Sequence, residues 1–317
     1  AAHSDERANR YRDKVKGTLV RLSDLLASSG VGGERATIDA GRRALLASDL
    51  HANTLVLDAV EQLAAPRRPV FFVGDFGHNG SEGEVRVVAP RLRRLGSSVI
   101  AVSGNHDSTA LMERLASVGV TVLTDNGRLH PDGSTDGKQV IDVEGLRVAG
   151  FSDPLEWHGT RPDDPKRIFG FSELANGDQR RVQAEDDLVK WYDGLPEHPN
   201  VVLVHQNGLA QHLAATIAER PGHEPVTILT GHDHKQHVDR HGDIVVIDAG
   251  SVGAGGVLGI GDEDVGVADL HFEAAAPAVA AVDLVQVDPF SGSAQAQRVI
   301  VDGNDCATGE TSCQLSP

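Results

Sequence analysis

The chain has 317 residues, of which 40% are hydrophobic, and its formal net charge at pH 7 is −17. This length allows one large domain or two small ones, each with a substantial core. The negative charge argues against a general nucleic-acid binder, because the phosphate backbone would be repelled. Aromatic residues make up only 4% of the chain, which is too few for a base-stacking surface. A small phosphorylated substrate stays compatible with this charge, because bound cations reverse the local field.

Apolar residues recur every three or four positions over residues 5–29, which predicts an amphipathic helix. The opposite face carries five basic residues, Arg7, Arg10, Arg12, Lys14 and Lys16. We favour a helix packed on the surface of the main domain, and the alternative is a juxtamembrane connector with a polybasic face. Residues 1–40 are therefore expected to form this helix and a linker.

Residues 41–303 alternate between short apolar runs and amphipathic segments, which is typical of a doubly wound α/β domain. The predicted buried strands cover residues 44–48, 70–73, 99–102, 121–123, 201–204 and 226–230. The predicted helices cover residues 54–64, 84–95, 108–118 and 209–219. A hairpin is expected from residues 139–143 and 146–151, joined by Glu144-Gly145.

The irregular stretch 152–199, with a helix at 178–192, is expected either to shape a substrate site or to pack on the surface. Antiparallel pieces follow at residues 237–240, 244–248, 267–272, 281–287 and 298–301, and residues 304–317 form a polar tail. The two cysteines, Cys306 and Cys313, both lie in this tail, where a disulfide would constrain the tail more than the fold. A disulfide in the tail would indicate an oxidising compartment.

The chain begins at Ala1 without a methionine, which is compatible with a leader or membrane segment upstream. Together with the basic helix and the tail cysteines, this favours an extracytoplasmic location, exported or membrane-anchored, with a cytoplasmic location as the alternative. Any membrane attachment would run through a segment upstream of Ala1, because no apolar run in the chain reaches the roughly 18 residues of a membrane span.

Polar residues follow five of the predicted strands, in the same position relative to each strand end. They are Asp49 and His51, Asp75, Asn105 and His106, His205, and His232 and His234. Each residue alone is compatible with a helix cap or a buried structural role. Ligands of open α/β sheets bind at the carboxyl ends of the strands, so the whole set points to one site. Its imidazole, carboxylate and amide groups suit two borderline cations such as Mn, Fe, Zn or Co.

The order of these residues resembles the five motifs of the calcineurin-like metallophosphoesterases. The matching motifs are Asp49-x-His51, Gly74-Asp75, Gly104-Asn105-His106-Asp107, His205 and Gly231-His232-x-His234, spread over residues 43–253. The resemblance implies a four-layer α/β/β/α sandwich, in which two facing mixed β-sheets are flanked by helices. The antiparallel C-terminal pieces would then fit the second sheet.

The resemblance also implies a role for each residue. Asp49, His51 and His234 would bind one metal ion; Asn105, His205 and His232 would bind a second; Asp75 would bridge the two. His106 would protonate the leaving oxygen or stabilise the transition state. Asp107 would orient His106, although it or Ser108 is equally compatible with a cap on the helix that begins near Thr109.

The implied activity is hydrolysis of a phosphodiester or phosphomonoester by in-line attack of a metal-bridging hydroxide. The expected partner is a small phosphorylated substrate rather than nucleic acid, and the oligomeric state stays open. A non-catalytic metal-binding module on the same fold is the alternative. Such modules usually lose ligands or the acid histidine, and none of these residues is missing here.

Some surroundings of the motifs differ from common family members. Asp75 is followed by Phe76-Gly77-His78-Asn79-Gly80 instead of an aliphatic-Asp pair, and we favour an exposed turn over substrate contact for His78 and Asn79. The protein Ser/Thr phosphatase branch has Glu at the position of Asp107 and an arginine a few residues later. In this chain the first arginine after Asp107 is Arg114. Specificity is therefore expected to depend on the loops 76–83 and 152–199.

Overall fold

A computed structural model describes residues 9–17, 42–64, 68–95, 99–156, 179–256, 263–273 and 277–301. The polar tail with Cys306 and Cys313, most of the linker and much of the 152–199 stretch lie outside these ranges. Within them the chain forms two β-sheets, one of eight strands and one of six. No helix in these ranges is long and apolar enough to cross a membrane.

The first sheet has the strand order β14-β13-β12-β1-β2-β3-β4-β5. Its strands are β1 (Arg43–Ala47), β2 (Val70–Val73), β3 (Val99–Val102), β4 (Thr121–Thr124), β5 (Gly127–Arg128), β12 (Val265–Phe272), β13 (Val279–Val287) and β14 (Ala294–Ile300). Strands β1 to β4 are parallel, whereas β5 and the three C-terminal strands pair antiparallel with their neighbours. The sheet is therefore mixed.

The second sheet has the order β10-β11-β9-β8-β7-β6. Its strands are β6 (Ile141–Val143), β7 (Leu146–Phe151), β8 (Val201–Gln206), β9 (Val226–Gly231), β10 (Gln236–His241) and β11 (Ile244–Ala249). Its four inner strands are parallel and both edge strands are antiparallel. Parallel strands that are buried on both faces read as continuous apolar runs, which is why the sequence reveals them.

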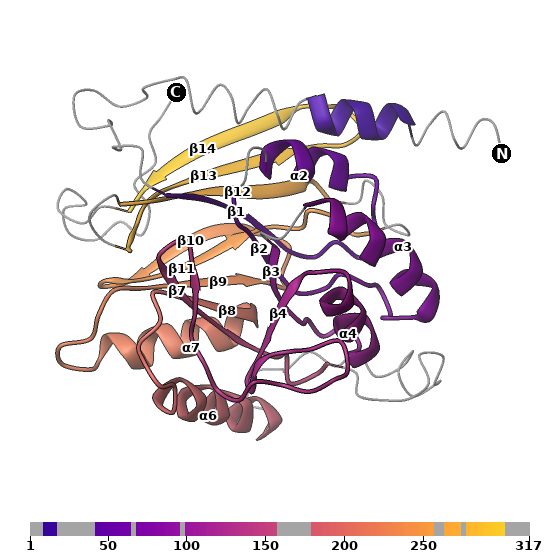
Figure 1. Cartoon of the computed structure of the whole chain (residues 1–317). Coiled ribbons are helices and arrows are strands. Elements are labelled where there is room, and N and C mark those ends of the chain that lie inside the picture. The colour runs from indigo at the N-terminus through magenta and orange to yellow at the C-terminus, as the bar shows by residue number, and fades with distance from the viewer. Residues whose placement is uncertain are drawn as a thin grey trace.

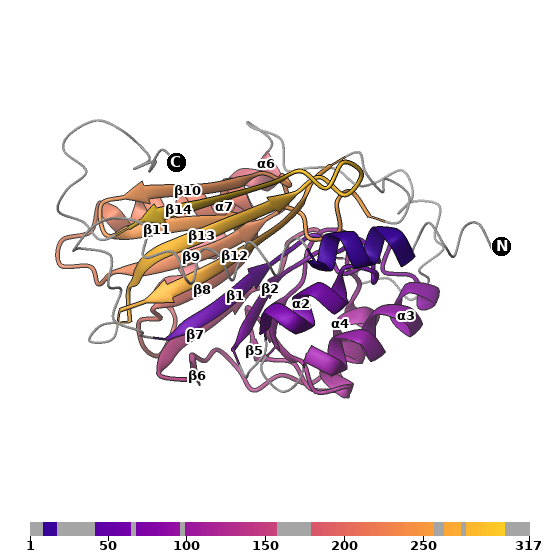
Figure 2. The same cartoon turned by 90° about the horizontal axis from the view of Figure 1, so that it is seen from above.

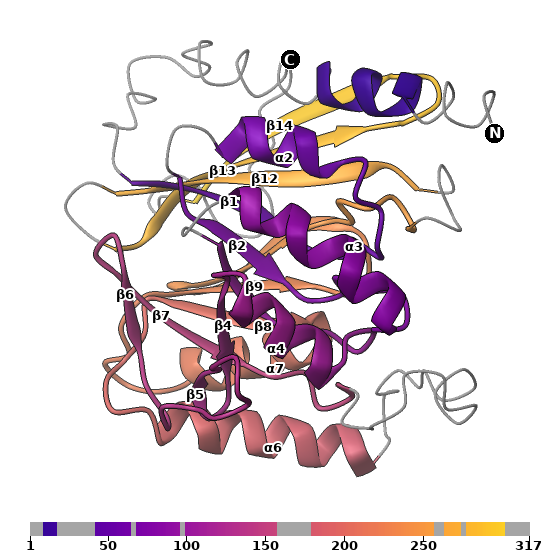
Figure 3. The same ribbon diagram turned by 45° about the vertical axis from the view of Figure 1, so that its right-hand side comes forward.

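Helices cover the outer face of each sheet. They are α2 (Leu57–Ala64), α3 (Glu82–Leu92), α4 (Thr109–Ser117), α6 (Gln179–Asp193) and α7 (Asn207–Ala218), with a 3₁₀ turn, η1 (Arg93–Leu95), after α3. Figure 1 shows α2, α3 and α4 along the right-hand side of the first sheet, and α6 and α7 below the second. Figure 3 shows α6 beside α7, on the side of the molecule away from α2. The predicted four-layer α/β/β/α sandwich is confirmed.

Side-chain alternation along the strands builds the layers. In β2, Phe72 packs in the core between the first sheet and its helices, whereas Phe71 packs in the core between the two sheets. A third core lies between the second sheet and α6 and α7, and includes Leu188 and Leu213. Because the central core holds side chains from both sheets, it fixes how the carboxyl ends of their strands meet.

The N-terminal helix is confirmed for residues 9–17, and the rest of the predicted 5–29 segment lies outside the described residues. Tyr11 and Val15 are buried in the outer core together with Val285 and Val287. Figure 2 shows this helix beside α2. The basic residue Arg12 lies 3.6 Å from Asp58 of α2. This part of the helix therefore packs on the domain, as the favoured interpretation predicts.

The prediction for the C-terminal strands is wrong in part. Strands β10 and β11 belong to the second sheet as expected, but β12, β13 and β14 extend the first sheet. β12 pairs antiparallel with β1, with Arg43 opposite His271. This pairing joins segments more than 200 residues apart and is supported by the ion pair between Arg43 of β1 and Asp269 of β12. Local periodicity carries no information about such a partner.

The central core makes a testable prediction about stability. Phe71 is fully buried, whereas Phe290 is 61% exposed. Phe71→Ala should lower the free energy of unfolding by about 3–5 kcal/mol, because it removes buried apolar surface and leaves a cavity between the sheets. Phe290→Ala is the matched control and should change it by less than about 0.5 kcal/mol in urea unfolding. Equal effects of the two substitutions would contradict the proposed core.

Candidate metal centre

The polar strand ends of both sheets meet at one place. One group consists of Asp49, His51 and His234. The His51 Nε2 atom lies 3.0 Å from the His234 Nε2 atom. The His234 Nε2 atom lies 3.4 Å from Asp49 Oδ1. These three residues come from the ends of β1 and β9, so they join the first sheet to the second. They are one of the clusters of described residues with the spacing of metal ligands.

A second group forms around Asn105, which follows β3. Its Oδ1 atom lies 3.1 Å from His205 Nε2 and 3.1 Å from His232 Nδ1. Asp75 lies between the two groups. Its Oδ2 atom is 3.3 Å from His205 Nε2 and 3.8 Å from His51 Nε2. The structure thus brings together all seven residues that the sequence predicts as metal ligands.

The donor set fits metal ions. Ligand atoms that each lie about 2.0–2.2 Å from one ion are about 3–4 Å apart, which is the spacing found here. Two of the histidines are also held from behind, as metal-binding histidines usually are. His205 Nδ1 lies 2.8 Å from the carbonyl oxygen of Val73, and His234 Nδ1 lies 2.6 Å from Glu263 Oε2. Both contacts direct the Nε2 atom toward the centre.

The backbone at the centre is unusual. Among the residues that the structure describes, eight non-glycine residues have a left-handed backbone, and five of them belong to the centre: Asp49 (φ 55°), His51 (φ 44°), Asp75 (φ 54°), His232 (φ 82°) and His234 (φ 59°). Such conformations cost about 1–3 kcal/mol each and persist where the surroundings impose them. Their concentration here indicates a functional site.

Glycine allows the loops to approach closely. A Cβ atom on Gly104 would lie 2.1 Å from Asp75 Oδ1, and one on Gly231 would lie 2.7 Å from Asp49 Oδ2. No side chain fits at these distances. These two glycines therefore let the β3 and β9 loops lie directly against the carboxylates of the centre.

Burial and neighbouring charges shift the pKa values of the centre. Burial alone would raise the pKa of Asp75, but the charge of His205 and its hydrogen bond outweigh burial and lower it. Burial lowers the pKa of His51 to about 4, against the opposing effect of the Asp75 and Asp49 carboxylates. Burial would also lower the pKa of His234, but Asp49 and Glu263 raise it to about 9. Ionised carboxylates among histidines are the state that binds cations.

His106 lies at the edge of the centre. Its backbone N–H donates to Asp75 Oδ1 over 2.8 Å, and its Nδ1 atom lies 2.7 Å from the carbonyl oxygen of His78. Its ring lies 4.9 Å from the ring of His51, edge to face. The side chain is thus next to the predicted ligands and is held through Nδ1.

Asp107 is completely buried. Its Oδ1 accepts from the backbone N–H of Gly77 at 3.0 Å, and its Oδ2 accepts from that of Gly104 at 2.9 Å. Burial, together with the charge of Asp75, raises the pKa of this carboxyl group. The cap of α4 is Ser108, whose hydroxyl accepts from the backbone N–H of Leu111. Asp107 therefore connects the loops after β2 and β3, and its predicted catalytic role of orienting His106 stays a prediction.

The prediction of an exposed turn at His78 and Asn79 is wrong, because both are half-buried. The carboxylate of Glu84 accepts from the backbone N–H groups of His78 and Asn79, and folds the loop back onto α3. The His78 ring lies 5.9 Å from that of His51 and 5.6 Å from that of His106. Ser81 and Glu84 form a capping box at the start of α3, and their spacing in the sequence indicates that a helix begins directly after this loop.

Two further residues near the centre were not predicted as part of it. Asp153 is buried and accepts two hydrogen bonds from Gln206 Nε2, the residue after His205. Burial raises the pKa of Asp153 to about 6. It follows β7 just as the predicted ligands follow their strands, so its position could have indicated it. The other residue is Glu263, which comes from an irregular segment with no periodic signal.

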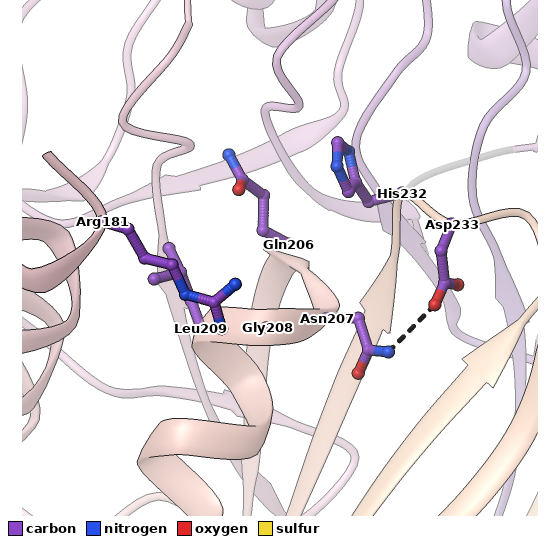
Figure 4. Close-up of a pocket in the computed structure, with 7 residues that line it drawn as sticks. All are labelled: Arg181, Gln206, Asn207, Gly208, Leu209, His232 and Asp233. Carbon is purple, nitrogen blue, oxygen red and sulfur yellow. Dashed lines mark hydrogen bonds between the residues drawn. The ribbon is translucent and has the colours of Figure 1, made fainter. Parts of the chain in front are cut away.

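A cavity of about 190 Å³ opens beside the centre. Its lining comprises Arg181, Gln206, Asn207, Gly208, Leu209, His232 and Asp233. Figure 4 shows Arg181 extending from α6 toward the start of α7, and Asn207 donating to Asp233 on the far wall. Because His232 is both a cavity wall and a predicted ligand, the cavity adjoins the centre.

A family model for the calcineurin-like phosphoesterase superfamily domain matches residues 43–261, which include all the residues of the centre. The chain belongs to the calcineurin-like phosphoesterase superfamily. The predicted resemblance is therefore confirmed, and the chain belongs to a superfamily made up mostly of phosphoesterases. None of the curated proteins matches the chain.

Several solved structures resemble this superfamily member. A single mutant of Vps29 from Entamoeba histolytica is 14% identical, with a TM-score of 0.39. The match covers 82% of this chain and 99% of the Vps29 chain. A novel archaeal phosphodiesterase is 14% identical with a TM-score of 0.35, covering 80% of this chain and 98% of its own. Phosphopantetheinyl hydrolase (PptH) from Mycobacterium tuberculosis is 16% identical with a TM-score of 0.42, covering 67% and 90%. These are similarities of architecture alone.

The close approach at Gly104 makes a testable prediction. Gly104→Ala would push a methyl group into the Asp75 carboxylate and should weaken metal binding about 10–100-fold, as loss of supporting contacts does. Calorimetric titration with Mn²⁺ measures this effect. Gly83→Ala in α3 is the control, because a Cβ atom there meets nothing closer than 3.9 Å and should leave the affinity unchanged. Unchanged affinity in Gly104→Ala would show that Asp75 takes no part in binding.

Proposed function

We propose that this protein is a metal-dependent phosphoester hydrolase with a dinuclear centre. The observation that carries the proposal is the position of the Asp75 carboxylate, which lies within 3.8 Å of histidine nitrogens of both ligand groups. In this proposal Asp49, His51 and His234 hold one ion, and Asn105, His205 and His232 hold the other. Membership of the superfamily supports the assignment.

Bound ions would supply a Lewis acid for the phosphoryl oxygens and make an attacking water more acidic. The chain supplies the rest of the chemistry. The buried carboxylates of Asp49 and Asp75 give the centre the negative charge that retains cations. The contact of His205 with the Val73 carbonyl and that of His234 with Glu263 keep both rings in the orientation of ligands.

His106 is the proposed general acid. Its Nδ1 atom is held by the His78 carbonyl oxygen, so a proton for the leaving oxygen would be carried on Nε2. An alkoxide leaving group needs such a proton, because expulsion of an unprotonated alkoxide is slow. Asp107 supports this step indirectly. It accepts from the backbone N–H groups of Gly77 and Gly104, and so fixes the loop that carries His106 against the loop after β2.

The cavity beside His232 is the proposed position of the substrate. Arg181, whose Nε atom is paired with Glu185 Oε1 at 2.8 Å, and the N-terminus of α7 line this cavity. Their N–H groups suit the anionic oxygens of a phosphoester. Asn207 and Asp233 on the opposite wall suit polar groups of the alcohol part. A cavity of about 190 Å³ favours a small substrate.

The proposed activity predicts metal-activated turnover. The purified protein should hydrolyse bis(p-nitrophenyl) phosphate or p-nitrophenyl phosphate when Mn²⁺ is added, and chelation should abolish the reaction. Release of p-nitrophenol measures it. An absence of turnover across Mn, Fe, Co, Ni and Zn, with metal bound, would refute the proposal and favour the non-catalytic module.

The role of His106 is tested separately. His106→Ala should lower kcat by about 10²–10⁴-fold, the usual contribution of a general acid, while metal content stays unchanged because His106 is not a ligand. His130→Ala is the matched control. His130 is a surface histidine paired with Asp136, and it is not one of the predicted site residues. Loss of metal in His106→Ala would instead make His106 a ligand.

A further inference from the structure

A second group of potential ligands lies behind the candidate metal centre. Asp233, His237 and Asp248 each offer a ligand atom, and these atoms all lie within 4.8 Å of one another. None of the three is a predicted ligand of the centre. They come from the loop after β9 and from the neighbouring strands β10 and β11, where His237 and Asp248 are directly paired.

Asp248 is the decisive member of this group, because it is completely buried. Its Oδ1 accepts from the backbone N–H of Gly250 at 2.7 Å. Its Oδ2 has no hydrogen-bond partner among the described residues, and the Asp233 carboxylate lies near it. A buried carboxylate oxygen that faces another carboxylate is unfavourable unless a cation or a shared proton lies between them.

The Nε2 atom of His237 is the third potential ligand atom, beside Asp233 and Asp248. Its Nδ1 atom lies 3.0 Å from the carbonyl oxygen of Lys235, so Nδ1 carries the proton. Its Nε2 atom is buried and has no hydrogen-bond partner in the described part of the chain, with Asp239 Oδ2 at 3.6 Å. A ring held by a carbonyl through one nitrogen, with the other facing carboxylates, is the usual arrangement of a metal-binding histidine.

The charge around this group is uncompensated. Asp233 accepts from Asn207 Nδ2 at 3.0 Å, and Asp239 accepts from Gln211 Nε2 at 2.6 Å, so both are supported by neutral amides. Neither Asp233 nor Asp248 forms an ion pair with a lysine or arginine in the ranges that the structure covers. A divalent cation would supply the missing positive charge.

We propose that Asp233, His237 and Asp248 form a separate binding site for a divalent transition-metal ion such as Zn²⁺. One imidazole nitrogen and two carboxylate oxygens suit Zn²⁺ better than Mg²⁺ or Ca²⁺, which prefer oxygen ligands alone. The ion ties the loop after β9 to β10 and β11. This loop carries His232 and His234, whose left-handed backbones need such support.

The test is the zinc content of single variants. The full chain is loaded with Zn²⁺, freed of excess metal and measured by mass spectrometry. Asp248→Asn and His237→Gln should each retain about one zinc ion per chain fewer than the wild type. His241→Gln is the control, because His241 lies on the same strand and contacts Gln211 instead. Its zinc content should equal that of the wild type.

The readout is a difference between variants, so it does not depend on whether the centre around Asp75 holds two ions or turns over a substrate. The two substitutions, Asp248→Asn and His237→Gln, are then repeated in a protein that also carries Asp75→Asn. Each should again lower the zinc content by about one ion, which places the lost ion outside that centre. Failure of the dinuclear centre and failure of this site are thereby separated.

The opposite result is equally clear. The side-chain amide that Asp248→Asn introduces would donate to Asp233 just as a protonated carboxyl group would. Wild-type zinc content in that variant would therefore show that the two aspartates share a proton, and would overturn the proposal. If Asp248→Asn does not fold, His237→Gln decides the matter, because His237 lies on an edge strand and is 21% exposed.

Discussion

The contact between His205 and Asp75 is the interaction on which the candidate centre depends. His205 ends a strand of the second sheet and Asp75 follows a strand of the first, and both side chains are buried. Their atoms lie 3.3 Å apart, and His205 is also held by the carbonyl oxygen of Val73 on the first sheet. The two sheets must therefore pack in one register. The apolar core between them, which includes Phe71, fixes that register.

The conformation of the centre is unfavourable in free energy, and the surrounding fold stabilises it. Five left-handed residues and several buried ionisable side chains are unfavourable on their own. The backbone contacts of Asp107 and the Glu84 cap hold the loops after β2 and β3, and Gly231 lets the loop after β9 lie against Asp49 without a steric clash. Rigid support of this kind keeps donor atoms at fixed spacing before any ion binds, which favours tight binding of cations.

The sequence predicts the centre well because its residues follow apolar strands at a fixed place. Once β1, β2 and β3 are recognised as parallel neighbours, Asp49, Asp75 and Asn105 must share one edge of the first sheet, and His205 and His232 must likewise share one edge of the second. The position of β12 could not be predicted in this way, because its partner β1 lies far along the chain. Glu263 lies outside the strands, and the pairing of Asp248 with His237 depends on the register of β10 and β11. The spacing of Ser81 and Glu84 indicates where α3 begins, but it does not show that Glu84 also accepts from the backbone N–H of His78 and so buries that residue.

Crystallography of the Mn²⁺-loaded protein, with anomalous scattering at the manganese edge, tests the central claim most directly. The account predicts two anomalous peaks about 3.5–4 Å apart on either side of the Asp75 carboxylate, one near His51 and one near His205. A single peak in only one of the two ligand groups, or no peak within reach of Asp75, would contradict it.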